Sequence, residues 1–314
     1  MKRFLLIFIA LYTCEQDNTS LLPNSSGNLN VISVVLNDEL WKGSVGAALK
    51  NSFSKSIYGL PQREPMFSLK HIPIHVFSGF VTKGRTIIKV QKAKISKTSV
   101  EYNKYATPQI VIQFSGPSAK EILKLIKRDA NSMMALINKT EIVEKQRRIK
   151  KSLSKSLEIK NNLNINIKYP SVYRVAKSMD DFVWIRKDIK SGSLNLMIYE
   201  VPNKALLNRS YSQIRDSISK LHIPGPVEDT RMSIDDGYIT GIKEGVLNKS
   251  NYTEYRGLWE VKNQFMAGPF IGYKFDDKKN DRQIYLDGFV YAPSVNKRSY
   301  VFELESIIKS IIID

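Results

Sequence analysis

Hydrophobic positions follow two patterns in the first half of the chain. Short runs rich in β-branched residues, typical of strands, lie at residues 30–36, 66–74, 86–90 and 109–114. Apolar side chains three to four residues apart, typical of helices, follow Asn37 and recur from Pro117 to about Lys160. Because this stripe shifts near Asn138, the second stretch predicts two helices or one long bent helix. Residues 91–108 are basic and irregular and predict no regular element.

The second half of the chain alternates more strongly and contains two amphipathic segments. The segments at residues 206–221 and 297–311 predict helices. Strands are predicted at residues 165–169, 182–187, 194–201, 238–242, 252–262, 270–275 and 283–291. The chain is therefore predicted to be an α+β protein with domains at residues 29–161 and 162–314. Each domain is expected to be a mostly antiparallel or mixed sheet with helices packed on one face.

The chain begins with a pattern typical of exported proteins. A positively charged start precedes an apolar run that is too short to span a bilayer, which predicts a signal peptide at residues 1–13. The run ends beside Cys14, the only cysteine, in a sequence similar to the lipobox of bacterial lipoproteins. We therefore expect a lipid on Cys14 and a flexible tether at residues 14–28. The alternative is an ordinary cleaved signal with an incidental cysteine.

The charge of the chain favours acidic partners. It has 48 Lys and Arg residues against 30 Asp and Glu residues, a formal net charge of +18. Such a surface attracts anionic lipid, an acidic glycan or an acidic protein partner, whereas export argues against nucleic acid. A compositional bias toward Lys is the alternative explanation. With the lipid anchor, we expect an outer-membrane lipoprotein, and the sequence leaves open whether it faces the periplasm or the cell surface.

Candidate catalytic residues are few. No nucleotide-binding or hydrolase motif is present, and Pro73 between His71 and His75 opposes the helical spacing of a metal pair. We therefore predict neither a cofactor nor a metal site. Arg256 and Glu260 are four residues apart in a predicted strand, which places both on one face. We expect a structural ion pair between them; the alternative is that Glu260 is a catalytic carboxylate.

The tryptophans are the remaining candidate binding residues. Trp41, Trp184 and Trp259 either line a groove for a sugar or a peptide or fill the core. Filling the core is the commoner role of large aromatic side chains.

Six stretches of the chain resemble a known family. They are Asp38-Glu39-Leu40-Trp41-Lys42-Gly43, Gly59-Leu60-Pro61-Gln62, Phe182-Val183-Trp184-Ile185-Arg186, Ile223-Pro224-Gly225-Pro226-Val227, Arg256-Gly257-Leu258-Trp259-Glu260-Val261 and Gly288-Phe289-Val290-Tyr291-Ala292-Pro293. In this order and spacing they resemble the domain-of-unknown-function 4837 family, found among Bacteroidota lipoproteins. The resemblance extends from about Leu22 to the last predicted helix. It implies export and lipid anchoring, and it implies no activity.

Two functions remain open. We expect a non-enzymatic, lipid-anchored protein of the cell envelope that binds or scaffolds another molecule. The alternative is a hydrolase that acts on cell-wall or glycan material through carboxylates such as Glu260. An open cleft with a second carboxylate about 5 to 10 Å from Glu260 would favour the hydrolase, and burial of Glu260 against Arg256 would disfavour it.

Overall fold

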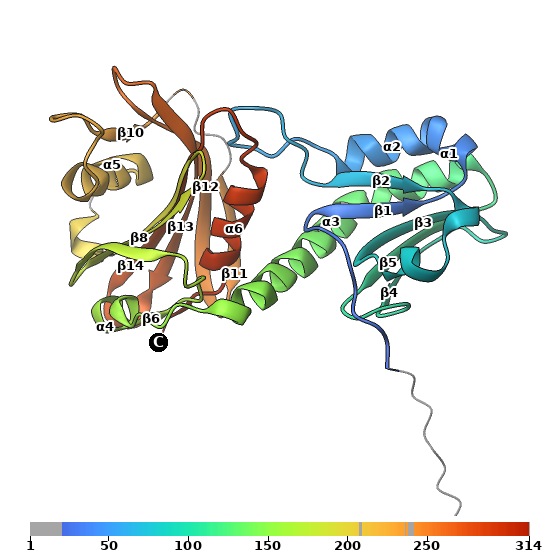
Figure 1. The fold of residues 1–314 in the computed structure, drawn as a ribbon, viewed down its shortest axis with the longest axis horizontal. Helices are drawn as coiled ribbons and strands as arrows, with labels where there is room; N and C mark the ends of the chain where they lie inside the picture. Colours follow the sequence, from blue (N-terminus) through green and yellow to red (C-terminus); the bar gives the residue numbers. More distant parts are fainter. Residues whose placement is uncertain (1–20, 207–208, 236, 238–241, 314) are drawn as a thin grey trace, which may run out of the picture.

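Two sheets, each with its own helices, are joined by the long helix α3 (Ala119–Ile149), which runs from the first sheet to the second (Figure 1). The computed structural model describes residues 21–313, apart from residues 207–208, 236 and 238–241. The predicted signal peptide, Cys14 and most of the predicted strand at residues 238–242 lie outside the described residues. The α+β class and the two-domain organisation are confirmed.

The first sheet is mixed. Its strands are β1 (Val31–Val35), β2 (Ser68–Ile72), β3 (Thr86–Lys92), β4 (Lys97–Tyr102) and β5 (Ile110–Gly116). Their order is β2-β1-β3-β5-β4; β4 and β5 pair antiparallel, and the other neighbours pair parallel. Strand β4 lies in the segment that was predicted to be irregular. It is an edge strand with half-exposed or exposed side chains, so it lacks the apolar run that marks an inner strand.

Three helices cover one face of this sheet: α1 (Asp38–Lys42), α2 (Ser44–Phe53) and α3. The helix start predicted after Asn37 is confirmed, because the Asn37 side chain accepts a hydrogen bond from the N–H of Leu40 at 3.1 Å. The core between the sheet and the helices includes Ile32, Val34, Leu49, Phe53, Ile88, Ile112, Phe114, Ile122 and Ile126.

Helix α3 is continuous over 31 residues and ends at Ile149, so its predicted extension toward residue 160 is wrong. Its first half buries apolar side chains against the first sheet as far as Ile137, whereas its second half also buries Glu141 and Glu144. The apolar stripe therefore shifts while the helix continues, because carboxylates take buried positions. A short turn and α4 (Glu158–Leu163) follow.

The second sheet is antiparallel. Its strands follow the order β10-β12-β13-β14-β9-β8-β7, and β11 pairs with β12. The bounds are β7 (Arg174–Met179), β8 (Phe182–Ile189), β9 (Gly192–Pro202), β10 (Met232–Ile234), β11 (Ile242–Leu247), β12 (Ser250–Val261), β13 (Met266–Asp277) and β14 (Arg282–Tyr291). A small pair is formed by β6 (Ile165–Asn166) and β15 (Ile312–Ile313). Strand β7 was not predicted; it is a sheet edge with no fully buried side chain.

Helices lie on both faces of the second sheet, where one covered face was expected. Helix α6 (Arg298–Ile308) and α4 pack on one face, and α5 (Tyr211–His222) packs on the other. Alternate positions of β9 explain this: Leu196 and Ile198 face α6, while Met197 and Tyr199 face α5. Among the helices of the described residues, none has the length and apolar character needed to cross a bilayer.

The two domains meet along α6. The Glu64 carboxylate, from the loop before β2, accepts hydrogen bonds from the N–H groups of Lys297 and Arg298 at 2.7 and 2.9 Å. The first domain therefore supplies the N-terminal cap of a helix in the second domain. On α3, Lys145 forms an ion pair with Glu303 at 2.7 Å. These contacts fix the walls of the cavity described next.

Candidate functional site

A cavity of about 390 Å³ lies between the two domains. The first domain contributes Asn30, Ile57, Tyr58, Met66 and Asn138, and the second contributes Ile242, Lys243, Glu254, Arg256, Arg298, Val301, Phe302, Glu305 and Lys309. Clefts at domain interfaces are common ligand sites, and this one combines an apolar wall with charged groups.

Arg256 on β12 is the centre of the charged part. Its Nε donates to Glu254 at 2.6 Å, and its Nη2 donates to Glu305 on α6 at 2.9 Å. Lys309 donates to the other oxygen of Glu305 at 2.5 Å, and the Tyr273 hydroxyl donates to Glu254. Both carboxylates are buried. The guanidinium fork thus joins a strand of the sheet to the helix that covers it.

The charges decide which protonation states this cluster holds. Burial raises the pKa of Glu305, but the positive charges of Arg256 and Lys309 outweigh burial and bring that pKa below its usual range. Burial and the nearby carboxylates raise the pKa of the Tyr273 hydroxyl. Glu305 is therefore ionised at neutral pH. It does not supply the protonated carboxylic acid that glycoside hydrolysis requires.

The stretch that begins at Gly59 lies in a loop that packs on Arg256. Gly59 has φ +77°, and a Cβ there would lie 2.9 Å from the Cβ of Arg256. The position therefore needs glycine for its backbone conformation and for close approach. This contact brings the neighbouring Tyr58 to the cavity wall, where its side chain stays largely exposed.

The expected ion pair between Arg256 and Glu260 is wrong. Arg256 pairs with Glu254 and Glu305 instead, and Glu260 is half-buried. The described residues that line the cavity do not include Glu260. The even spacing places Arg256 and Glu260 on one face of the strand, but Arg256 pairs with Glu254, two residues away, and with Glu305 on α6. The spacing of Glu254 was visible in the sequence, whereas Glu305 had no local signal.

The three tryptophans do not share a groove. Trp41 belongs to the first domain, where its ring stacks on His71 with a centroid distance of 4.8 Å. Trp259 is buried in the core under α5, on the opposite face from Arg256. Trp184 packs against that same core and donates to Asn195 at 3.2 Å.

Clustered metal ligands are the remaining chemical possibility. Within the described ranges of the chain, no group of three or more His, Cys, Asp or Glu side chains has the arrangement to hold a metal ion.

Residues 152–310, just over half of the chain, match the model of a family described as a domain of unknown function, DUF4837. The chain belongs to the DUF4837 family. The predicted family is confirmed, but its model contains only four of the six stretches, and the two at residues 38–43 and 59–62 lie outside it, so the expected extent from about Leu22 is wrong. Residues 25–150 match a second model, also a domain of unknown function, DUF8532. No curated protein matches the chain.

Similarity to solved structures is low. The Saccharomyces cerevisiae Ran-binding protein Mog1p has 9% identity and a TM-score of 0.30, with 48% of this chain and 89% of Mog1p covered. A Bacteroides thetaiotaomicron protein has 9% identity and a TM-score of 0.26, covering 48% of this chain and 45% of its own. The lipid transfer and protein localization domain of human StarD13 has 12% identity and a TM-score of 0.20, covering 44% and 88%. At these scores the similarities support no inference about the function of the DUF4837 protein.

Proposed function

We propose that this protein is a lipid-anchored protein of the cell envelope that binds an acidic glycan in the cavity between its domains and catalyses no reaction on it. The observation that carries the proposal is the charge of the cavity. Four cationic side chains line it, namely Lys243, Arg256, Arg298 and Lys309, against two carboxylates, Glu254 and Glu305.

The cationic excess supports an anionic ligand. The two carboxylates are already occupied by Arg256 and Lys309. Lys243 is exposed and has no ion pair among the described residues, so it is available to a ligand carboxylate. The apolar wall that includes Tyr58 and Phe302 offers a surface for a sugar ring.

Ion pairing also supports binding in preference to hydrolysis. A hydrolase of the carboxylate type uses one protonated acid and one free carboxylate. In this cavity both carboxylates accept hydrogen bonds from Arg256. Both acids are therefore held in ion pairs with Arg256, and neither is a free carboxylate that could act on a substrate.

Lipid anchoring and the outer-membrane location are proposed from the segment that ends at Cys14. Intact-mass measurement of the N-terminus in the native protein tests the anchor: a chain that begins at Cys14 and carries acyl mass supports it, and a chain that begins at Met1 contradicts it. Protease treatment of intact cells then distinguishes the surface from the periplasmic face.

The binding experiment compares an anionic oligosaccharide with its uncharged methyl ester. Trigalacturonate and its trimethyl ester are titrated into the purified full chain by calorimetry. We expect the acid to bind and the ester to bind at least about tenfold more weakly, the effect of one charge-assisted contact of roughly 1.4 kcal/mol. Equal binding of the two, or binding of neither, would overturn the glycan proposal.

Two exposed positions give matched variants. Lys243→Gln should weaken trigalacturonate binding by about tenfold. Lys262→Gln removes the same charge from an exposed turn outside the cavity and should leave binding unchanged. Equal loss in both variants would indicate a response to net charge and not recognition in the cavity.

A further inference from the structure

A second cavity, of about 420 Å³, lies in the first domain between α3 and the strand ends of the sheet. Its lining is mainly apolar and includes Tyr102, Pro108, Leu136 and Val143, and Lys139 and Arg147 of α3 also line it. The side chains of Tyr102 and Val143 are each 58% exposed, although both are large and apolar. The cavity is therefore an apolar surface with cations beside it.

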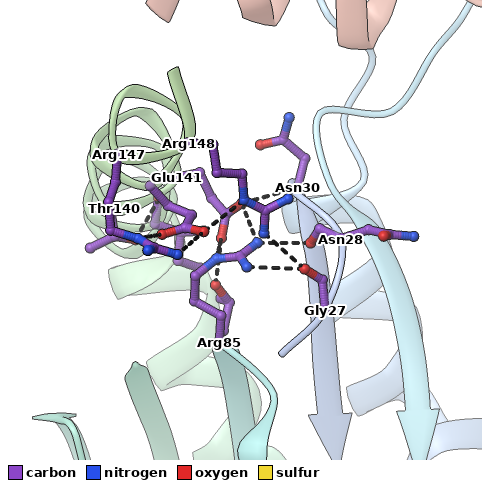
Figure 2. Close-up of polar contacts among 11 residues, drawn as sticks. Gly27, Asn28, Asn30, Arg85, Thr140, Glu141, Arg147 and Arg148 are labelled. Carbon is purple, nitrogen blue, oxygen red and sulfur yellow. Dashed lines mark hydrogen bonds and ion pairs between the residues drawn. The ribbon is translucent and has the colours of Figure 1, made fainter. Parts of the chain in front are cut away.

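Arg85 lines this cavity and belongs to a buried ion pair with Glu141, which lies behind it (Figure 2). Arg85 and the fully buried Glu141 pair at 3.0 Å, and Glu141 also accepts hydrogen bonds from the N–H of Asn30 at 2.7 Å and the hydroxyl of Thr86 at 2.9 Å. Arg85 donates in addition to the backbone oxygen of Asn28 at 2.8 Å. These groups are fully engaged with one another, so the ion pair is rigid and contributes no net charge.

The side chains around this ion pair carry an excess of positive charge. Glu144 accepts hydrogen bonds from Arg147 at 2.7 Å and from Arg148 at 2.7 Å, so one carboxylate serves two guanidinium groups. Burial raises the pKa of Glu144, but the two arginines outweigh it and lower that pKa, so the acid stays ionised. Lys139 is exposed and has no ion pair in the described part of the chain. The group of Lys139, Glu144, Arg147 and Arg148 therefore has a net positive charge.

Residues 23–25 pack against the first domain beside this cavity. The N–H of Ser25 donates to the backbone oxygen of Thr107 at 3.0 Å, and the N–H of Thr107 donates to that of Pro23 at 2.9 Å. Thr107 precedes Pro108, which lines the cavity. Part of the expected tether, residues 23–28, is thus held against the body. The segment from Cys14 to residue 22 spans at most about 30 Å, so a membrane that holds Cys14 is within reach of the cavity.

We propose that this cavity binds an anionic phospholipid of the anchoring membrane, with the phosphate beside Lys139 and Arg147 and the first acyl carbons against Val143 and Tyr102. The membrane as the source of the ligand follows from the proposed anchor. The chemistry of the cavity is independent of the glycan site, because the two cavities share no lining residue. Failure of glycan binding would therefore not affect the test of phospholipid binding, and the reverse also holds.

Photo-crosslinking in nanodiscs tests this site with the full chain. The discs contain phosphatidylcholine and a small fraction of a diazirine-labelled probe, either phosphatidylglycerol or phosphatidylcholine with the same acyl chains. We expect the phosphatidylglycerol probe to label the peptides that contain residues 102–110 and 136–147, and the phosphatidylcholine probe to label them much less. Equal labelling by the two probes would overturn the proposal. Suppression of labelling by millimolar inorganic phosphate would identify a free phosphate site and overturn the lipid assignment.

Matched variants on one helix sharpen the test. Lys139→Gln with Arg147→Gln should reduce labelling by phosphatidylglycerol about 25-fold, because each basic side chain near an anionic membrane contributes roughly fivefold. Lys120→Gln with Lys127→Gln removes the same charge from exposed positions of α3 outside the cavity and should not reduce it. Val143→Asp places a carboxylate on the apolar wall and should also abolish labelling. Equal reduction in both double variants would overturn the site.

Discussion

Two arginines of this protein, Arg85 buried and Arg256 half-buried, both pair with buried carboxylates but have different surroundings. Arg85 lies in the first domain beside Glu141, which has no exposed surface, and every partner of the pair belongs to the protein. Arg256 lies in the second domain between Glu254 and Glu305, at the wall of an open cavity. In the first cluster Arg85 lines the second cavity but Glu141 does not, whereas in the second cluster Arg256 and both of its acids line the cavity between the domains. The position of the paired acid, and not the presence of an ion pair or of a cavity, distinguishes the structural cluster from the candidate site.

The largest expected effect is the loss of stability when the cluster of Arg85 and Glu141 is broken. Glu141→Gln removes the charge that Arg85 requires, and we expect the free energy of unfolding to fall by about 3–5 kcal/mol. Urea denaturation followed by circular dichroism measures it. As a control, Glu101→Gln removes an exposed ion pair with Lys104 and should change stability by less than about 1 kcal/mol. A loss no larger than that of the control would show that the Arg85 cluster does not contribute substantially to the stability of the fold.

Breaking the cluster of Arg256, Glu254 and Glu305 should lower the free energy of unfolding by a smaller amount. Arg256→Gln leaves Glu254 and Glu305 without their shared partner, but Glu305 keeps its ion pair with Lys309. We expect a loss of about 2–4 kcal/mol, smaller than that of Glu141→Gln, in the same urea experiment. The comparison between the clusters fails if this loss is the larger one.

The pH dependence should follow the pKa of Glu305. Burial raises this pKa, but Arg256 and Lys309 outweigh burial and bring it from 4.5 to about 2. A lowered pKa in the folded state adds stability above pH about 4.5, and this stability is lost as the pH falls toward about 2. We expect Arg256→Gln to flatten the decline in this range when melting temperature is measured against pH. An unchanged slope would show that Arg256 does not stabilise the charge of Glu305.

The smallest effect concerns the contact between the domains. Glu64→Gln weakens the cap on α6, because an amide accepts the two N–H groups less strongly than a carboxylate does. We expect a loss of about 1 kcal/mol, together with a broader thermal transition as the domains unfold less cooperatively. Calorimetry measures both. A sharper transition with full stability would mean that Glu64 does not couple the domains.

The sequence predicted most elements whose signal is local. Inner strands such as β5 and β14 and helix α6 lie close to their predicted positions, because a buried face imposes a regular spacing of apolar residues. The edge strands β4 and β7 were missed for the converse reason, since an exposed edge needs no such spacing. In helix α3 the shift of the apolar stripe reflected the burial of Glu141 and Glu144, which a hydrophobic pattern does not register.

The candidate site was only partly predictable. Arg256 was singled out as the expected ion-pair partner of Glu260 in a predicted strand, and it lines the cavity between the domains. Its predicted partner was wrong, since Glu305 is 49 residues further along and reaches Arg256 only because α6 packs on β13 and β14.

The amino-acid sequence by itself determined the α+β class, the membership of the DUF4837 family and the helix start at Asn37. Each rests on residues that are neighbours in the chain or on an ordered set of short stretches. Only the tertiary structure decided which acid neutralises Arg256, where the cavities lie and which cations line them. The physical reason is that ion pairing depends on distances of about 3 Å between side chains from separate elements. Those distances exist only once the sheets and helices have packed.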